Sequence, residues 1–209
     1  MSTDSNPAHP AEPGASGYYE SLPPNLPAPE DDGAADHLTA MTLPSLELAV
    51  AGGGRFDLRE AATIGTLVAF VYPRTGTPGQ PMPPGWDDIP GASGCTPQSC
   101  AFRERHFALA GLGATVVGVS AMDPAEQHAF AERQLLPYPL LNDGPLLLRD
   151  ELGLPTFDVC GMTLYKRLTF VARAGRIEKV FYPVFPPDRD AAEVESWLCE
   201  RRQGARGTT

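Results

Sequence analysis

One corner constrains the fold of this chain most: an apolar run followed, after a proline-rich stretch, by Gly94-Cys95-Thr96-Pro97. The run, residues 66–72, is short, β-branched and aromatic, which predicts a buried strand. Proline is tolerated in the first turn of a helix because its missing N–H has no intrahelical partner there. Pro97 and the helix-compatible residues behind it therefore predict a helix over 97–112, with Cys95 at its N-terminal mouth.

A cysteine at this position has a distinctive chemistry. The unpaired N–H groups and the positive dipole end of a helix favour a negative charge, so we expect the thiolate of Cys95 to be stabilised. Cys100 follows five positions later, which in an intact helix separates the two Cα atoms by about 8–9 Å. A disulfide needs less than about 7 Å. Cys95 and Cys100 can therefore bridge only if the first turn or two of the helix unwinds.

The rest of the chain alternates strand and helix patterns. A glycine turn at 52–54 predicts a β-hairpin from residues 46–50 and 55–58. Further strands are predicted at 114–120, 167–172 and 176–182, and helices at about 124–135, 143–152 and 189–202. This order predicts an α/β fold: a thioredoxin-like sandwich in which a mixed central sheet has helices on both faces, behind the N-terminal hairpin.

The N-terminal segment differs in composition from the remainder. Residues 1–40 are rich in Pro, Ala and Asp, which predicts a disordered tail ahead of one domain at 41–203. The alternative is that four apolar residues of this segment pack onto the domain or a partner: Tyr18, Tyr19, Leu22 and Leu26.

Charge and cysteine usage exclude several function classes. The net charge is −10, residues 1–50 hold eight acids and no Lys or Arg, and no basic cluster suggests a nucleic-acid partner. No signal peptide or membrane-length apolar run is visible, so we expect a cytoplasmic protein with no membrane partner. Four cysteines without a secretory signal then predict reduced thiols, and a close pair of them is catalytic or metal-binding.

Two stretches resemble the peroxiredoxins, in particular the Q-type or bacterioferritin-comigratory-protein group. They are Tyr72-Pro73-Arg74-Thr75-Gly76-Thr77-Pro78-Gly79 and Cys95-Thr96-Pro97-Gln98-Ser99-Cys100-Ala101-Phe102-Arg103. Downstream, residues 166–171 and 175–181 resemble the late arginine strand and hairpin of that family. The likeness covers roughly residues 43–198.

The resemblance implies a thiol-dependent peroxidase that reduces hydrogen peroxide and organic hydroperoxides. It implies that Cys95 is the peroxidatic cysteine, which is oxidised to a sulfenic acid, and that Cys100 resolves this acid as a disulfide. It also implies that Arg167 supplies a cation, Thr77 a hydroxyl and Pro73 a shield for the thiolate. The expected reductant is thioredoxin or a similar dithiol, the expected assembly a monomer or weak homodimer, and no cofactor or metal is expected.

The chain departs from the family motif by an insert of fifteen residues, Gln80–Gly94, directly before Cys95. The insert puts Thr77 and Pro73 in question, and Ser93 could supply the hydroxyl instead. Its prolines and glycines predict a loop. Because long loops in compact domains are usually functional or disordered, we expect an ordered lid over the Cys95 pocket, anchored by Trp86; the alternative is a mobile surface excursion.

Other functions compete with a peroxidase. A non-enzymatic redox sensor or binding protein could use Cys95–Cys100 as its switch, although a sensor needs neither Arg167 nor a hydroxyl beside the thiolate. A zinc site lacks a second Cys or His pair. A thiol–disulfide oxidoreductase usually has Cys-x-x-Cys spacing, which is absent. Cys160 and Cys199 are interpreted as spectators.

Overall fold

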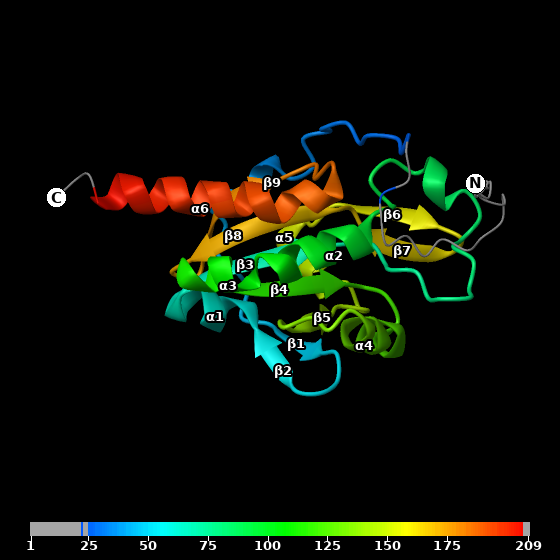
Figure 1. Cartoon of the computed structure of the whole chain (residues 1–209), viewed down its shortest axis with the longest axis horizontal. Coiled ribbons are helices and arrows are strands. Elements are labelled where there is room, and N and C mark those ends of the chain that lie inside the picture. The colour runs from blue at the N-terminus through cyan, green and yellow to red at the C-terminus, as the bar shows by residue number, and fades with distance from the viewer. Residues whose placement is uncertain (1–21, 23–24, 207–209) are drawn as a thin grey trace, which may run out of the picture.

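The predicted strand at residue 66 lies inside a seven-stranded sheet, between two other strands (Figure 1). The computed structural model describes residue 22 and residues 25–206. The strand order is β2-β1-β5-β4-β3-β8-β9, with β3, β4 and β5 parallel and the other pairings antiparallel. The strands are β1 Glu47–Val50, β2 Arg55–Asp57, β3 Thr66–Val71, β4 Ala114–Ser120, β5 Leu140–Asn142, β8 Leu168–Arg173 and β9 Arg176–Phe181.

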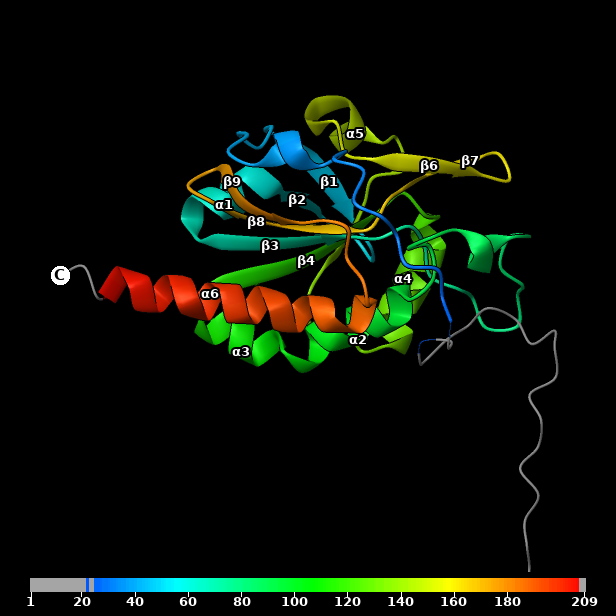
Figure 2. The ribbon, with the colours of Figure 1, turned by 90° about the horizontal axis from the view of Figure 1, so that it is seen from above.

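Helices cover both faces of this sheet (Figure 2). Side chains of β3 alternate between two apolar clusters, which explains its unbroken apolar sequence. Leu67 packs with α1 Leu58–Ile64 and α5 Leu147–Leu152 on one face. Phe70 packs on the other face with α2 Cys95–Glu104, α3 His106–Gly111, α4 Pro124–Arg133 and α6 Asp190–Arg206. The predicted mixed sheet between two helical layers is confirmed.

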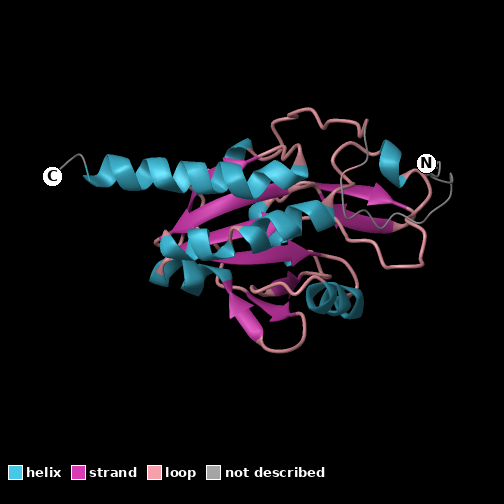
Figure 3. Ribbon diagram, in the orientation of Figure 1, coloured by secondary structure: helices cyan, strands magenta, loops and turns pink. Residues whose placement is uncertain are grey.

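A second, two-stranded sheet lies beside the insert. β6 Thr156–Val159 and β7 Met162–Tyr165 form an antiparallel hairpin that was not among the predicted elements. Figure 3 shows the insert as a long loop with one short helical turn, Trp86–Asp88, near this hairpin. Trp86, 3% exposed, packs with Val159 and Leu164 in a third apolar cluster. The hairpin is therefore the surface that holds the insert in place.

Three further elements differ from the prediction. The side chain of Asp57 accepts a hydrogen bond from Glu60 N at 2.9 Å, so this residue caps α1 and the chain turns into a helix at Leu58. The predicted helix 97–112 is two helices, because the backbone at Arg105 (φ −98°, ψ 4°) leaves the α-helical conformation. Strand β5, only three residues long, was not predicted.

Part of the predicted tail is docked on the domain. Residues 1–21 and 23–24, including Tyr18 and Tyr19, lie outside the described residues, whereas residues 25–40 run along the domain surface. Leu38 is fully buried, and the Asp32 carboxylate accepts hydrogen bonds from Lys166 Nζ at 2.6 Å and Tyr182 Oη at 2.7 Å. These two donors hold the pKa of Asp32 well below its usual value. From residue 25 onward the segment is thus part of the folded unit.

No helix among the described residues has the length and apolar character needed to cross a membrane.

The buried Asp143 carboxylate caps the start of α5 and connects this helix to strand β7. Its carboxylate accepts hydrogen bonds from Leu147 N at 2.8 Å, Leu148 N at 2.9 Å and Tyr165 Oη at 2.6 Å. We expect Asp143→Ala to lower the free energy of unfolding by about 2–4 kcal/mol, because three buried donors lose their acceptor. Urea denaturation measures this change. Asp150→Ala, an exposed change in the same helix, should cost less than about 0.5 kcal/mol, and equal losses would contradict the assignment.

Candidate active site

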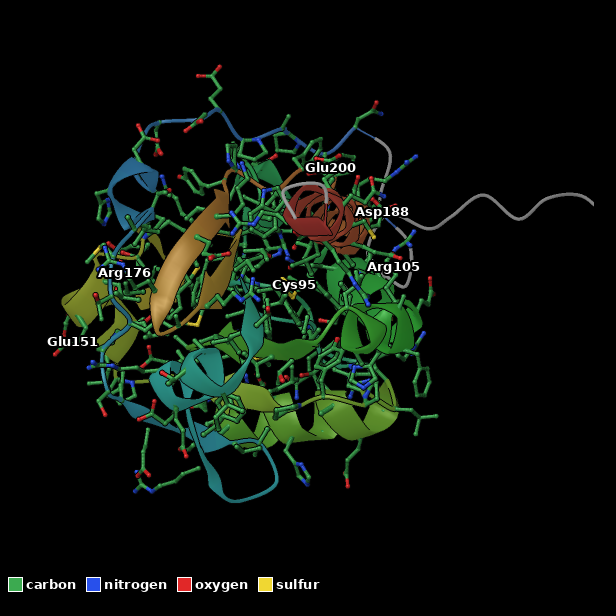
Figure 4. All side chains as sticks on the ribbon, turned by 90° about the vertical axis from the view of Figure 1, so that its left-hand side faces the viewer. Cys95, Arg105, Glu151, Arg176, Asp188 and Glu200 are labelled. Carbon is green, nitrogen blue, oxygen red and sulfur yellow. The ribbon has the colours of Figure 1, made fainter. Side chains whose placement is uncertain are left out.

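Cys95 is the first residue of α2 and is only 2% exposed. Gly94 precedes it with φ at 102°, a conformation that favours glycine. A Cβ atom on Gly94 would approach Pro187 Cγ at 2.7 Å and Leu22 Cδ2 at 2.8 Å, so glycine is required here for space as well. Figure 4 places Cys95 inside the molecule, whereas the labelled Glu151 and Arg176 lie at its periphery. The thiol therefore sits at a tightly packed strand-to-helix corner.

Arg167 is the cation beside this thiol, as predicted. Its Nη2 group donates to Cys95 Sγ at 3.2 Å and to the carbonyl oxygens of Ala92 and Ser93 at 3.1 Å each. Arg167 is 3% exposed, which places the guanidinium in a poorly solvated environment where its attraction for a thiolate is strong. One side chain thus holds both the nucleophile and the end of the insert.

A chain of hydrogen bonds extends from Arg167 into the protein. Arg167 Nη1 donates to Gln98 Oε1, and Gln98 Nε2 donates to Asp190 Oδ2 at 2.6 Å. The hydroxyl of Thr169 donates to the same carboxylate oxygen at 2.7 Å. Burial raises the pKa of Asp190 to about 6, and the hydrogen bonds from Thr169 and Gln98 offset part of this rise. Because the carboxylate only accepts, it orients the Gln98 amide with its oxygen toward Arg167.

A small cavity of about 20 Å³ opens beside Cys95, which is room for about one water molecule. Thr75, in the loop that follows β3, lies on the cavity wall. It is 2% exposed, and its hydroxyl donates to Met122 Sδ at 3.7 Å. The insert supplies Met82 and Trp86 to the opposite part of the wall. The insert therefore forms an ordered cover over the thiol, with Trp86 buried beneath it.

Two predicted site residues lie elsewhere. Thr77 is absent from the cavity wall, because the chain turns outward there and Gln80 N bonds to Thr77 O at 3.0 Å. Pro73 is buried but also does not line the cavity, and its carbonyl oxygen accepts from Ser120 Oγ at 2.7 Å. The cavity wall instead carries three hydroxyl-bearing residues, Thr75, Ser93 and Thr96.

Ser93 lines the cavity, but its side chain has another partner. Its hydroxyl donates to Asp87 Oδ1 at 2.7 Å, within the insert, while its carbonyl oxygen faces Arg167. Ser93 therefore acts on the site through its backbone.

Cys100 lies one and a half turns along α2 and is half-buried. Its Sγ atom lies 3.4 Å from Gln134 Oε1, at the end of α4, whereas Cys95 Sγ contacts Arg167. Tyr138 Oη donates to Ser99 O at 2.6 Å and fastens this part of the helix. Cys95 and Cys100 are both thiols in this structure, on different sides of an intact helix. Cys160 is exposed at the tip of the β6–β7 hairpin, and Cys199 lies on α6.

Comparison with known proteins decides the family. The Redoxin family model matches residues 38–198. The chain belongs to the Redoxin family. Peroxiredoxin Q, chloroplastic, from Gentiana triflora is 34% identical over 133 residues, which cover 63% of this chain and 54% of that protein. The Sedum lineare protein of the same name is 36% identical over 130 residues, covering 61% and 60%. This Redoxin-family chain spans about half the length of the curated relatives it matches.

Solved structures agree with this assignment. Peroxidoxin BcpB from Mycobacterium tuberculosis superposes with a TM-score of 0.63 at 27% identity, covering 78% of this chain and 96% of that one. Xanthomonas campestris peroxiredoxin Q superposes with a TM-score of 0.61 at 24% identity, covering 77% and 97%. The resemblance to peroxiredoxins of the Q type is confirmed by these relatives, and the thioredoxin-like fold is the one they share.

Sequence reasoning missed Gln98, Asp190, Thr169 and Thr75. Gln98 lies within the quoted motif, between the two cysteines, and its helical position beside Cys95 was available as a signal. Asp190 is 92 residues further on and gave no local signal, because an Asp near a predicted helix start reads as an ordinary cap.

The position of Trp86 on the cavity wall leads to a prediction about the access of reagents to Cys95. We expect Trp86→Ala to speed the reaction of Cys95 with a bulky maleimide by about tenfold or more relative to iodoacetamide, because the wall of a water-sized cavity is removed. Mass spectrometry of Cys95-containing peptides measures both rates. Phe107→Ala, at a side chain 85% exposed on α3, is the control. An unchanged ratio in Trp86→Ala would show that the insert does not limit access.

Proposed function

We propose that this protein is a thiol peroxidase that reduces hydrogen peroxide and organic hydroperoxides at Cys95. The observation that carries the proposal is the 3.2 Å contact between Arg167 Nη2 and Cys95 Sγ, two buried side chains. Membership of the Redoxin family and the peroxiredoxin Q relatives support the same activity. The cation stabilises the thiolate, and only the thiolate is nucleophilic enough to attack a peroxide.

The first step is a two-electron oxidation of Cys95. The thiolate attacks one oxygen of the O–O bond, a sulfur–oxygen bond forms, and the O–O bond breaks. The departing oxygen leaves as alkoxide or hydroxide and takes up a proton to become an alcohol or water. We assign the Arg167 guanidinium, which donates to Cys95 Sγ, to stabilise this developing negative charge, with the Thr75 hydroxyl on the cavity wall as a second donor. The product on the protein is a sulfenic acid.

The second step is resolution by Cys100. Its sulfur attacks the sulfenic sulfur of Cys95, a disulfide forms, and the hydroxyl group leaves as water after protonation. An intact helix keeps the Cα atoms about 8–9 Å apart, so the start of α2 must unwind first. An external dithiol such as thioredoxin then reduces the disulfide by thiol–disulfide exchange. Every electron delivered to the peroxide is thereby returned by the dithiol.

A redox sensor remains the second candidate, with the same disulfide as its switch. The sensor oxidises once per signal, whereas a peroxidase turns over as long as a dithiol is supplied. The Arg167 cation beside the sulfur favours turnover, because it stabilises the negative charge of the departing alkoxide and so speeds each cycle. We also propose a cytoplasmic location, where thiols stay reduced, and a monomer or weak homodimer.

Cysteine variants separate the two steps. We expect Cys95→Ser to abolish peroxide consumption in an assay coupled to thioredoxin and its reductase, since no thiolate remains to attack. Cys100→Ser should still consume one equivalent, seen by intact mass as a gain of one oxygen on Cys95, but should not turn over with thioredoxin. Cys160→Ser and Cys199→Ser are the matched controls, expected to keep wild-type rates. Turnover by Cys95→Ser would refute the peroxidase assignment.

Arg167→Lys tests the cation while keeping its charge. Lysine cannot make the several directed contacts that the guanidinium makes, so we expect the rate of Cys95 oxidation to fall on the order of a hundredfold. Stopped-flow measurement of the first oxidation, with circular dichroism to confirm folding, gives this rate. Arg105→Lys, at an exposed ion pair with Glu195, is the control. Equal rates in Arg167→Lys and wild type would remove Arg167 from the reaction.

A further inference from the structure

Asp190 is a fully buried carboxylate at the first residue of α6, 1% exposed. Its Oδ2 atom accepts hydrogen bonds from Gln98 and Thr169, which are neutral donors. Its Oδ1 atom is buried and has no hydrogen-bond partner among the residues that the structure describes. An ionised carboxylate in such a place is under-stabilised, because burial removes water that two neutral donors only partly replace.

The electrostatic surroundings do not neutralise this charge fully. Arg167, which contacts Gln98, acts favourably on Asp190, and Glu193, one turn along α6, acts unfavourably. The partners from α2 and β8 carry no charge. With its pKa raised to about 6, mainly by burial, Asp190 is nevertheless ionised at neutral pH. The structure therefore holds a buried negative charge under the first turn of α2.

We propose that Asp190 is a positioning residue for the resolution step: its buried charge weakens the start of α2 and favours the unwound form in which Cys100 reaches Cys95. This inference rests on the proposed function, because it assigns Asp190 to the disulfide-forming step of that reaction. Gln98 lies between the two cysteines on α2. Unwinding there therefore breaks the hydrogen bond from Gln98 to Asp190 and exposes the carboxylate to water.

The direction of the effect follows from proton linkage. In the wound form the pKa of Asp190 is about 6, and in a form where water reaches the carboxylate it returns toward 3.8. The wound form therefore binds the proton more tightly. As the pH rises from about 4 through about 6, the wound form loses stability relative to the unwound form. Below about pH 4 both forms are protonated and the contribution disappears.

Asp190→Asn removes the charge and keeps the shape. The Asn oxygen can accept both hydrogen bonds of Oδ2, so the site remains assembled. We expect amide exchange across residues 94–103 of the reduced protein to slow by about tenfold or more at pH 7.5 relative to wild type. The ratio should shrink as the pH falls through about 6 and approach one only below about pH 4, where both forms of wild-type Asp190 are protonated. Asp188→Asn, an exposed change of the same charge two residues earlier, is the control and should leave exchange unchanged.

Thr169→Val tests the same idea in the opposite direction. It removes one of the two donors to the carboxylate, so the charge becomes costlier and exchange across residues 94–103 should become faster at pH 7.5. Exchange across residues 47–57, at the far edge of the sheet, serves as an internal reference for general loosening. This variant keeps the proposal testable even if Asp190→Asn does not fold.

The chemical readout uses the lifetime of the sulfenic acid. After one equivalent of hydrogen peroxide, Asp190→Asn should form the Cys95–Cys100 disulfide about tenfold more slowly, seen by intact mass, and excess peroxide should yield more sulfinic acid. Equal or faster exchange in Asp190→Asn, or a ratio that does not change with pH, would overturn the role of Asp190. If exchange responds as expected but wild type consumes no peroxide, the proposed function fails while the helix coupling stands.

Discussion

The guanidinium of Arg167 is the interaction on which the rest of the site depends. It reaches from the residue before β8 to three separate pieces of chain: the thiol at the start of α2, the last residues of the insert and the Gln98 amide. A planar group with five donors can hold all three at once, which a lysine ammonium cannot do in a fixed geometry. Because the group is buried, each of its partners would lose a hydrogen bond in an apolar environment if it moved away.

This arrangement explains how the fold tolerates fifteen extra residues before its nucleophile. The insert is held at one end by carbonyl oxygens facing Arg167, and in its middle by Trp86 packed on the β6–β7 hairpin. A long loop anchored twice loses much of the entropy that would otherwise leave it mobile. The insert can therefore serve as a wall of the cavity. Thr77 does not line this cavity, and the loop after β3 contributes Thr75 to the wall.

Local patterns predicted the parts of the site that lie within single elements. Cys95 followed from a strand, a glycine and a proline in close succession, whereas Arg167 followed from the resemblance to the peroxiredoxins. The contacts that assemble the site join residues far apart in sequence, such as Gln98 and Asp190, and no periodicity signals them. Short elements were missed for a related reason. Strand β5 and the β6–β7 hairpin are too short for alternation to be distinguished from loop sequence, and tertiary pairing defines them.

The proposed catalytic cycle makes two opposing demands on α2. The oxidation step needs its first turn wound, because only then does Cys95 sit against Arg167 at the positive end of the helix. The resolution step needs the same turn unwound, because the helix otherwise keeps Cys100 on another side, near Gln134. The two demands meet at position 190, whose side chain accepts a hydrogen bond from Gln98 of α2. A buried carboxylate there lowers the stability of the wound turn while orienting Gln98 toward Arg167, so a single residue serves both demands.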